Sequence, residues 1–145
     1  LRFGVVLGRR GGALAAMLGA FRKGLGGPLA GGRQWWPWVH LSDAVGLIEF
    51  ALANPACRGP INVVSPEPVR QREFARTLGR VLRRPAVLPA PAFVLRMVLG
   101  EFAQVLLTSQ RVVPARAREL GYRFAFPNLE SALDEILGTP PRGSP

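Results

Sequence analysis

The chain has 145 residues, of which 48% are hydrophobic, so it is long enough for one ordinary domain and too apolar for intrinsic disorder. Its formal net charge is +10, but the positive charges come from arginines dispersed along the chain, and Lys23 is the one lysine. No nucleic-acid-binding motif accompanies this charge. Cys57 is the only cysteine, which excludes an internal disulfide and indicates a reducing, cytoplasmic compartment, and no apolar run reaches the roughly 18 residues of a membrane span.

The first third of the chain predicts a strand, a helix and a glycine-rich loop. Residues 3–7 form a short apolar run, typical of a strand buried on both faces. The chain opens within this run without an initiating Met, so we expect it to be a piece of a longer protein. Apolar residues then recur at helical spacing over residues 14–21, and Gly24 ends that helix. Residues 24–32 indicate a flexible, glycine-rich turn.

Residues 34–40 contain all three tryptophans and predict an extended segment, in which Pro37 argues against a central strand. Ser42 or Asp43 is expected to cap the next helix, which ends at Asn54. The apolar face of that helix is predicted to hold Val45, Ile48, Phe50 and Leu52.

A second buried strand is predicted at residues 61–64, followed by a helix that Pro85 stops. This order of strands and helices is typical of the α/β class. A proline-rich linker follows, and the remaining elements are expected to be mostly helical: a helical stretch at 93–107 broken near Gly100, a short helix at 115–120, a short strand at 122–126 and a last helix from Asn128.

No self-contained catalytic constellation is present in the sequence. The glycine-rich stretches lack the spacing of a dinucleotide or phosphate loop, and one cysteine with one histidine cannot make a zinc site. A Ser-His-Asp site with His40 and Asp43 is formally possible, but no nucleophile elbow occurs and Asp43 suits a helix cap better.

The cluster of Gln34, Trp35, Trp36, Trp38 and His40 has two open interpretations. It is either a packing seam or the wall of a pocket that is apolar with a few polar groups. Because strand side chains alternate, we expect either Trp36 or the side holding Trp35 and Trp38 to face away from the core.

Three motifs in order, at residues 1–8, 38–44 and 59–65, resemble the later half of extended short-chain dehydrogenases/reductases. In particular they resemble the NAD-dependent epimerase-like subfamily, and residues 100–138 resemble its small C-terminal domain of unknown function. The resemblance implies an α/β fold: the C-terminal portion of a Rossmann-type sheet plus a mostly helical substrate and C-terminal lobe. It divides the chain into an epimerase-like part (1–84), the small domain (85–138) and a frayed tail (139–145).

The resemblance implies that the parent protein is an NAD(P)-dependent oxidoreductase or epimerase with a small-molecule substrate. The family's glycine fingerprint and its catalytic Tyr-x-x-x-Lys pair would lie earlier than this sequence. Tyr122 is the sole tyrosine here, and Phe126 stands where the lysine would be. We therefore expect no catalytic residue, no retained cofactor and no dehydrogenase activity in this chain alone.

The family's layout assigns site residues by position. It implies that residues on the substrate side are Gln34, Trp35, Trp38, His40 and Arg111, and that those near the cofactor are Arg2, Phe3 and Gly4. His40 is expected to orient its neighbours rather than transfer protons. For Arg111 the alternative is a salt bridge to Glu101 or Glu119.

Two departures from the family bear on the substrate. Sugar-nucleotide members typically carry Asn where Val5 stands, and often a phosphate-clamping Arg where Trp36 stands. We therefore expect a less charged carbonyl or alcohol, unless nearby arginines compensate: Arg9, Arg10 or Arg33. The alternative from another class is a non-enzymatic basic module that binds nucleic acid or a protein; a nucleic-acid or membrane partner is not expected.

Overall fold

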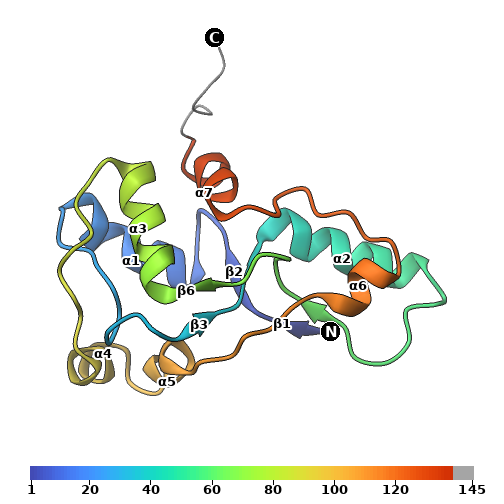
Figure 1. Ribbon diagram of the computed structural model, residues 1–145, viewed down its shortest axis with the longest axis horizontal. Coiled ribbons are helices and arrows are strands. Elements are labelled where there is room, and N and C mark those ends of the chain that lie inside the picture. Colours follow the sequence, from blue (N-terminus) through green and yellow to red (C-terminus); the bar gives the residue numbers. More distant parts are fainter. Residues whose placement is uncertain (139–145) are drawn as a thin grey trace, which may run out of the picture.

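Three short pairs of strands form the centre of the structure, and helices pack around them (Figure 1). The computed structural model describes residues 1–138; the tail expected at 139–145 lies outside the described residues. β1 (Arg2–Phe3) pairs in parallel with β5 (Asn62–Val63), β2 (Val5–Leu7) in parallel with β4 (Trp38–His40), and β3 (Trp35–Trp36) antiparallel with β6 (Val69–Arg70). Parallel pairs joined through helices confirm the α/β class.

The strand predicted at residues 3–7 is interrupted at Gly4. Its first half pairs with β5 and its second half with β4, so the partner changes at this glycine. A Cβ at Gly4 would lie 2.8 Å from the Pro37 carbonyl oxygen and 2.9 Å from Val64 Cγ1, so only glycine lets the three segments meet. The expected burial on both faces is wrong for the first half, because Phe3 is 50% exposed.

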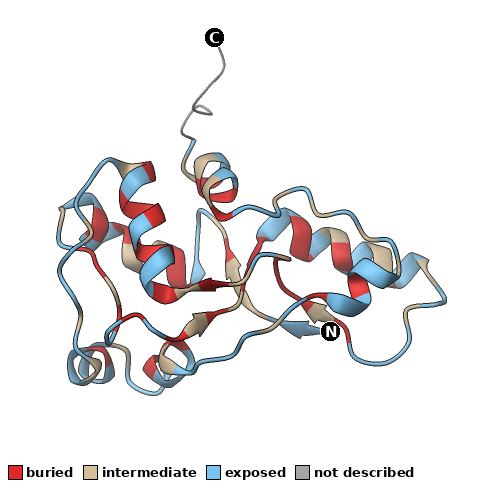
Figure 2. Cartoon of the chain, in the orientation of Figure 1, coloured by how far each residue is buried: buried red, intermediate tan, exposed pale blue. Residues whose placement is uncertain are grey.

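The larger core lies among α1 (Gly12–Arg22), α3 (Gln71–Leu82) and α7 (Leu129–Leu137). α3 packs against both α1 and α7, and α1 also packs against β2. The buried faces of the three helices point toward one another (Figure 2). Large buried side chains in this core come from β2, the tryptophan segment and all three helices: Leu7, Leu14, Phe21, Trp36, Trp38, Phe74, Leu78 and Leu133. The helical spacings in these segments predicted these buried faces.

A second core lies between α2 (Leu41–Ala53), β5 and α6 (Ala115–Glu119). It contains Val39, whereas the neighbouring Trp38 belongs to the larger core. The two cores therefore lie on opposite sides of β4, as strand alternation requires.

The predicted apolar face of α2 is wrong. The buried apolar residues are Ala44 and Leu47, whereas Val45, Ile48 and Leu52 are exposed. Of the predicted face, Phe50 alone is partly buried, against the ring of Tyr122. Two apolar stripes exist on this helix, and periodicity alone does not decide between them. The buried stripe is the one that adjoins Asp43, whose carboxylate is bonded to the C-terminal segment.

The segment after α3 is mostly helical, as expected, with α4 (Ala92–Leu99) and α5 (Phe102–Leu107) separated at Gly100. The glycine-rich loop before β3 is not a free turn: a Cβ at Gly27 would collide with the Leu88 backbone, and Leu29 forms a bridge with Ala90. The loop is therefore packed under the linker. The strand predicted at 122–126 is wrong as well, because Ala125 and Phe126 donate their N–H groups to a side chain instead of a neighbouring strand.

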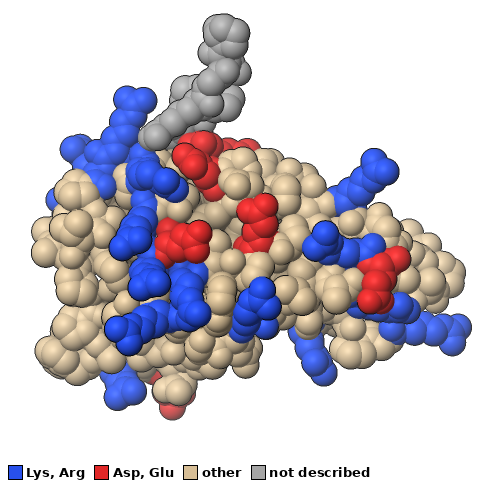
Figure 3. All heavy atoms as spheres, in the orientation of Figure 1, with Lys and Arg blue, Asp and Glu red and all other residues tan. Residues whose placement is uncertain are grey.

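The surface is basic, but the charges are mixed. Basic side chains lie over both ends of the face shown in Figure 3, and acidic side chains lie among them. Within residues 1–138, every helix is too short or too polar to cross a membrane.

Candidate functional site

Two adjoining hollows lie along the broken strand at Gly4. Their volumes are about 500 Å³ and about 460 Å³, and both are lined by Phe3, Gly4, Pro37 and Gln110. We call the two together the strand cleft. One wall is the strand at residues 3–6, and the other is formed by residues 102–113, which we call the roof. The cleft thus lies where the first part of the chain meets the C-terminal segment.

The two halves of the strand cleft differ in chemistry. The first hollow has apolar walls, including Val5, Trp36 and Phe102, and Thr108 and Gln110 are its only polar side chains among the described residues. The second hollow is lined by two guanidinium groups and two amides, from Arg2, Asn62, Gln110 and Arg111. No acidic side chain in the described part of the chain lines either hollow. The cleft therefore suits a ligand that is apolar at one end and polar or anionic at the other.

Side-chain contacts hold the roof over the cleft at two places. The backbone N–H of Trp35 donates to Ser109 Oγ at 3.0 Å, and the Arg111 guanidinium lies 5.3 Å from the centre of the Trp35 ring. Arg70 approaches the same ring at 4.2 Å. Further along, Asn62 Nδ2 donates to the Val113 carbonyl at 3.3 Å. Trp35 therefore positions Arg111 for the cleft.

The alternative expectation for Arg111, a salt bridge, is wrong. No ion pair within residues 1–138 joins Arg111 to Glu101 or Glu119; Glu119 pairs with Arg116 at 3.4 Å. The aromatic ring of Trp35 takes that place because β3 lies beside the roof.

The structure brings together four of the residues expected at the site. Arg2, Phe3 and Gly4, expected near the cofactor, line the second hollow with Arg111, expected on the substrate side. Trp35 contacts the roof but lines neither hollow. Asn62 and Gln110 were not predicted, because nothing in their sequence neighbourhood indicates that the roof folds over the strand.

Gln34 and Trp38 lie away from the strand cleft. Gln34 is buried, and its Nε2 donates to the Leu29 carbonyl at 3.1 Å. Trp38 is 1% exposed, and its Nε1 donates to the Glu67 carbonyl at 3.2 Å. The grouping of Trp35 with Trp38 was wrong: Trp36 and Trp38 share the core, as residues two apart in a strand should. Trp36 also lines the first hollow, and its buried Nε1 has no hydrogen-bond partner among the described residues.

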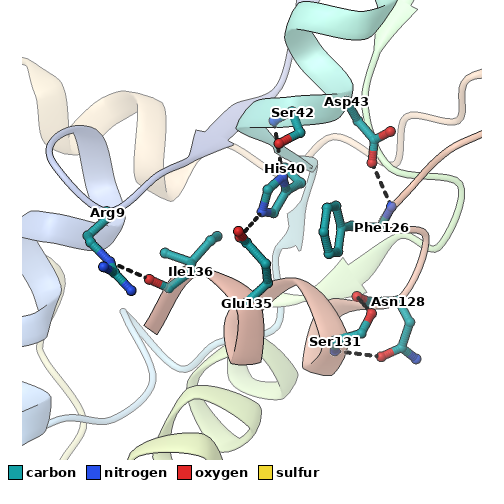
Figure 4. A network of polar contacts seen from close by, with 9 residues as sticks. All are labelled: Arg9, His40, Ser42, Asp43, Phe126, Asn128, Ser131, Glu135 and Ile136. Atoms are coloured by element: carbon teal, nitrogen blue, oxygen red, sulfur yellow. Dashed lines mark hydrogen bonds and ion pairs between the residues drawn. The ribbon is translucent and has the colours of Figure 1, made fainter. Parts of the chain in front are cut away.

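His40 joins the start of α2 to α7 (Figure 4). Its Nδ1 accepts the Ser42 backbone N–H at 3.0 Å, so His40 caps α2, and neither Ser42 nor Asp43 does. Because Nδ1 is an acceptor, Nε2 carries the hydrogen, which it donates to Glu135 Oε2 at 2.7 Å. The ring also stacks on Phe126 at 4.0 Å. His40 lines neither hollow of the strand cleft, so the structure does not place it beside the other residues expected on the substrate side, and its orienting role stays a prediction.

Asp43 binds the loop that precedes α7. Its carboxylate is 1% exposed and accepts the backbone N–H groups of Ala125 and Phe126 at 2.7 and 2.8 Å. The Tyr122 hydroxyl donates to the same carboxylate at 3.3 Å. Burial, followed by the nearby Asp43 charge, raises the pKa of Tyr122 to about 12. We call these contacts of His40 and Asp43 the C-terminal clamp; both side chains are fully occupied by it, which removes the basis for a Ser-His-Asp site.

Two further bonds complete the attachment of the C-terminal segment. Arg9 Nε donates to the Ile136 carbonyl at 2.8 Å, where a cation also complements the C-terminal end of α7 (Figure 4). Ser65 Oγ donates to the Pro127 carbonyl at 2.9 Å. The chain that follows the roof is therefore fixed to the first part of the molecule at both ends of α7.

Comparisons with known proteins give matches over nearly the whole chain. Residues 90–136 match the family described as a domain of unknown function, DUF1731. The chain is 49% identical over 137 residues to an Arabidopsis thaliana protein named "Epimerase family protein SDR39U1 homolog, chloroplastic", covering 94% of this chain and 40% of that protein.

Solved structures agree with this match. The human epimerase family protein SDR39U1 (isoform 2), crystallised with NADPH, is 44% identical, with a TM-score of 0.90 over 94% of this chain and 47% of that one. A nucleoside-diphosphate sugar epimerase from Corynebacterium glutamicum is 26% identical, with a TM-score of 0.71 over 95% of this chain and 25% of that one. The chain thus spans less than half the length of the relatives it matches.

Proposed function

We propose that this chain, which belongs to the epimerase family of extended short-chain dehydrogenases/reductases and matches the C-terminal part of its members, forms the substrate side of an NAD(P)-dependent oxidoreductase or epimerase. The observation that carries this proposal is the strand cleft, which joins the residues expected near the cofactor to Arg111 on the substrate side. The partner that the parent protein binds in this cleft is then a small-molecule substrate.

The residues present fit only one end of a nicotinamide dinucleotide. The strand wall at Phe3 and Gly4, which both hollows share, suits a flat ring such as nicotinamide, and the NADPH in the human relative supports this choice of cofactor. The sequence contains no glycine fingerprint for the pyrophosphate and no Tyr-x-x-x-Lys pair. When bound, the cofactor supplies hydride transfer. We therefore propose that this chain alone is inactive.

The residues of this chain bind and orient the substrate. Gln110, Arg111 and Asn62 offer hydrogen-bond donors at one end of the cleft, while Val5 and Phe102 exclude water at the other. His40 acts at a distance, because the C-terminal clamp fixes the segment that follows the roof.

The single cysteine, Cys57, is free, which supports a reducing, cytoplasmic compartment.

The substrate is proposed to be a carbonyl compound or alcohol other than a nucleotide sugar. Val5 and Trp36 both line the first hollow, so the two positions where the family resemblance implies an amide and a guanidinium in sugar-nucleotide members are apolar there. An unpaired diphosphate beside such a wall loses charged hydrogen bonds of about 1.5–3 kcal/mol each. Arg9 is already bonded to α7, which reduces its capacity to compensate.

The test uses the natural protein that carries this sequence, at its full native length. We expect it to bind NADPH or NADH and to turn over members of a panel of ketones and alcohols. Arg111→Ala should raise KM for the substrate, whereas Arg118→Ala, an exposed arginine on α6 outside the cleft, should leave KM unchanged. Calorimetric titration with nucleotide sugars should show weak or no binding. Micromolar affinity for a nucleotide sugar, lost in Arg33→Ala, would overturn the substrate assignment.

A further inference from the structure

A third hollow lies between α1 and the helices α4 and α5. It has a volume of about 250 Å³, and we call it the helix pocket. One face of α1 lines it through Ala13, Ala16, Met17 and Ala20. Every described residue in its lining is apolar or glycine, so the pocket offers no side-chain hydrogen bond and no charge. Such a space suits hydrocarbon and rejects polar groups.

The helix pocket continues from the strand cleft. Ala13, Phe102 and Leu106 line both the helix pocket and the first hollow of the cleft. The second hollow holds most of the polar side chains of the cleft, and the first hollow has polar side chains only at the roof. The lining therefore becomes steadily less polar from Arg111, through the first hollow, to the helix pocket. One elongated molecule with a polar head and an apolar tail matches that order.

The rim of the helix pocket is apolar and open. Leu25, Leu88 and Val98 line the pocket and are 58%, 48% and 76% exposed. Contiguous exposed apolar surface of this kind commonly marks a ligand groove. Because an apolar cavity of roughly 150 Å³ holds a benzene molecule, the helix pocket has room for a tail of about ten carbon atoms.

We propose that the substrate is an alcohol or ketone with an aliphatic tail of about eight to ten carbon atoms, whose tail fills the helix pocket while its oxygen lies in the strand cleft. This assignment rests on the proposed function for the position of the reacting end. The tail site itself follows from the pocket and is testable without turnover.

The probe is methyl octyl ketone, compared with methyl ethyl ketone, on the natural protein with methyl-labelled methionine. Met17 lines the helix pocket, whereas Met97 is 81% exposed and outside its lining, so the two methyl groups serve as reporter and control. Each buried methylene tightens binding roughly four-fold, so the longer ketone should bind at least about a hundred-fold more tightly. We expect saturable shifts of the Met17 signal, assigned through Met17→Leu, and an unchanged Met97 signal.

Two variants test the location. Ala16→Trp places an indole at an exposed position in the pocket lining and should abolish the Met17 response; Ala20→Trp, one turn along, should do the same. Gly19→Trp, at an exposed position on the same helix with open space around it, should leave binding unchanged. Equal affinity for the two ketones would overturn the tail site. Equal shifts of the Met17 and Met97 signals, or ketone binding that survives in both Ala16→Trp and Ala20→Trp, would overturn the tail site as well.

The outcome separates the two proposals. Binding of methyl octyl ketone with no binding of NADPH or NADH would leave the tail site standing and contradict the proposed function. Cofactor binding and turnover of short ketones, with no preference for the longer tail, would contradict the tail site and leave the proposed function standing.

Discussion

Asp43→Asn is the substitution that most sharply tests the C-terminal clamp. The carboxylate is almost completely buried and accepts two backbone N–H groups at 2.7 and 2.8 Å. An asparagine keeps the shape but has one acceptor oxygen, so its amide nitrogen would face either the Ala125 or the Phe126 N–H, donor against donor. One charged hydrogen bond is lost, one is weakened, and a buried N–H is left unpaired.

The expected loss follows from these changes. Hydrogen bonds to charged groups contribute about 1.5–3 kcal/mol, and an unpaired buried donor costs about 1–3 kcal/mol, so we expect a loss near 3 kcal/mol in the free energy of unfolding. At about 3 °C per kcal/mol for a protein of this size, Tm should fall by roughly 10 °C. Thermal unfolding followed by circular dichroism measures it.

Asp134→Asn is the matched control, because it makes the same chemical change on α7. Among the described residues the Asp134 side chain makes no hydrogen bond or ion pair that the change would remove, and its Oδ1 is buried without a partner. Its effect should stay within about 0.5 kcal/mol. The clamp would be refuted if Asp43→Asn had the same Tm as the unsubstituted protein, or if Asp43→Asn and Asp134→Asn lost equal amounts of unfolding free energy.

Three further predictions follow from particular contacts. Tyr122 is the sole tyrosine of this chain, so the absorbance of its phenolate should titrate near pH 12, and the midpoint should move toward 10 in Asp43→Asn. Because folding raises the pKa of Tyr122, its contribution to the free energy of unfolding is present below pH 10 and is lost as the pH rises through about 12. A titration near pH 10 in the folded protein would contradict this prediction. Gly46→Ala in α2 should destabilise the protein, since the new Cβ would meet the Tyr122 hydroxyl, whereas Gly19→Ala in open space on α1 should gain up to about 1 kcal/mol; equal stabilisation in chemical unfolding would disprove the contact. The isolated chain should be oligomeric or poorly soluble because apolar side chains on α2 are exposed to solvent. Leu52 is 84% exposed, and Leu52→Gln should raise the fraction of monomer measured by light scattering. A monodisperse monomer of the unsubstituted chain would argue against this prediction.

Local signals predicted the helices well. The spacing of apolar residues in α3 and α7, and the stop signals at Pro85 and Gly100, act within one or two turns, so the sequence alone identifies these elements. The wrong predictions share a different cause. The burial of Asp43 and the missing strand at 122–126 both result from two hydrogen bonds between segments about 80 residues apart, which no local pattern records.

The candidate site was predicted in part for the same reason. Arg2 and Arg111 were expected from the family's layout and do line one cleft. Gln110 and Asn62 were missed because the roof is positioned by Trp35 and by its own end contacts, not by its sequence. The helix pocket was also missed, since small residues on α1 predict close packing as readily as an open space.

Hydrogen–deuterium exchange of the natural protein, with and without NADPH, tests the central proposal most directly, because it needs no known substrate. If the strand cleft faces the nicotinamide, NADPH should slow exchange at residues 2–6 and in the roof at 102–113, and leave α6 unchanged. NADPH binding that leaves both segments of the cleft unaltered, or no binding at all, would contradict the assignment of this chain to the substrate side of an NAD(P)-dependent enzyme.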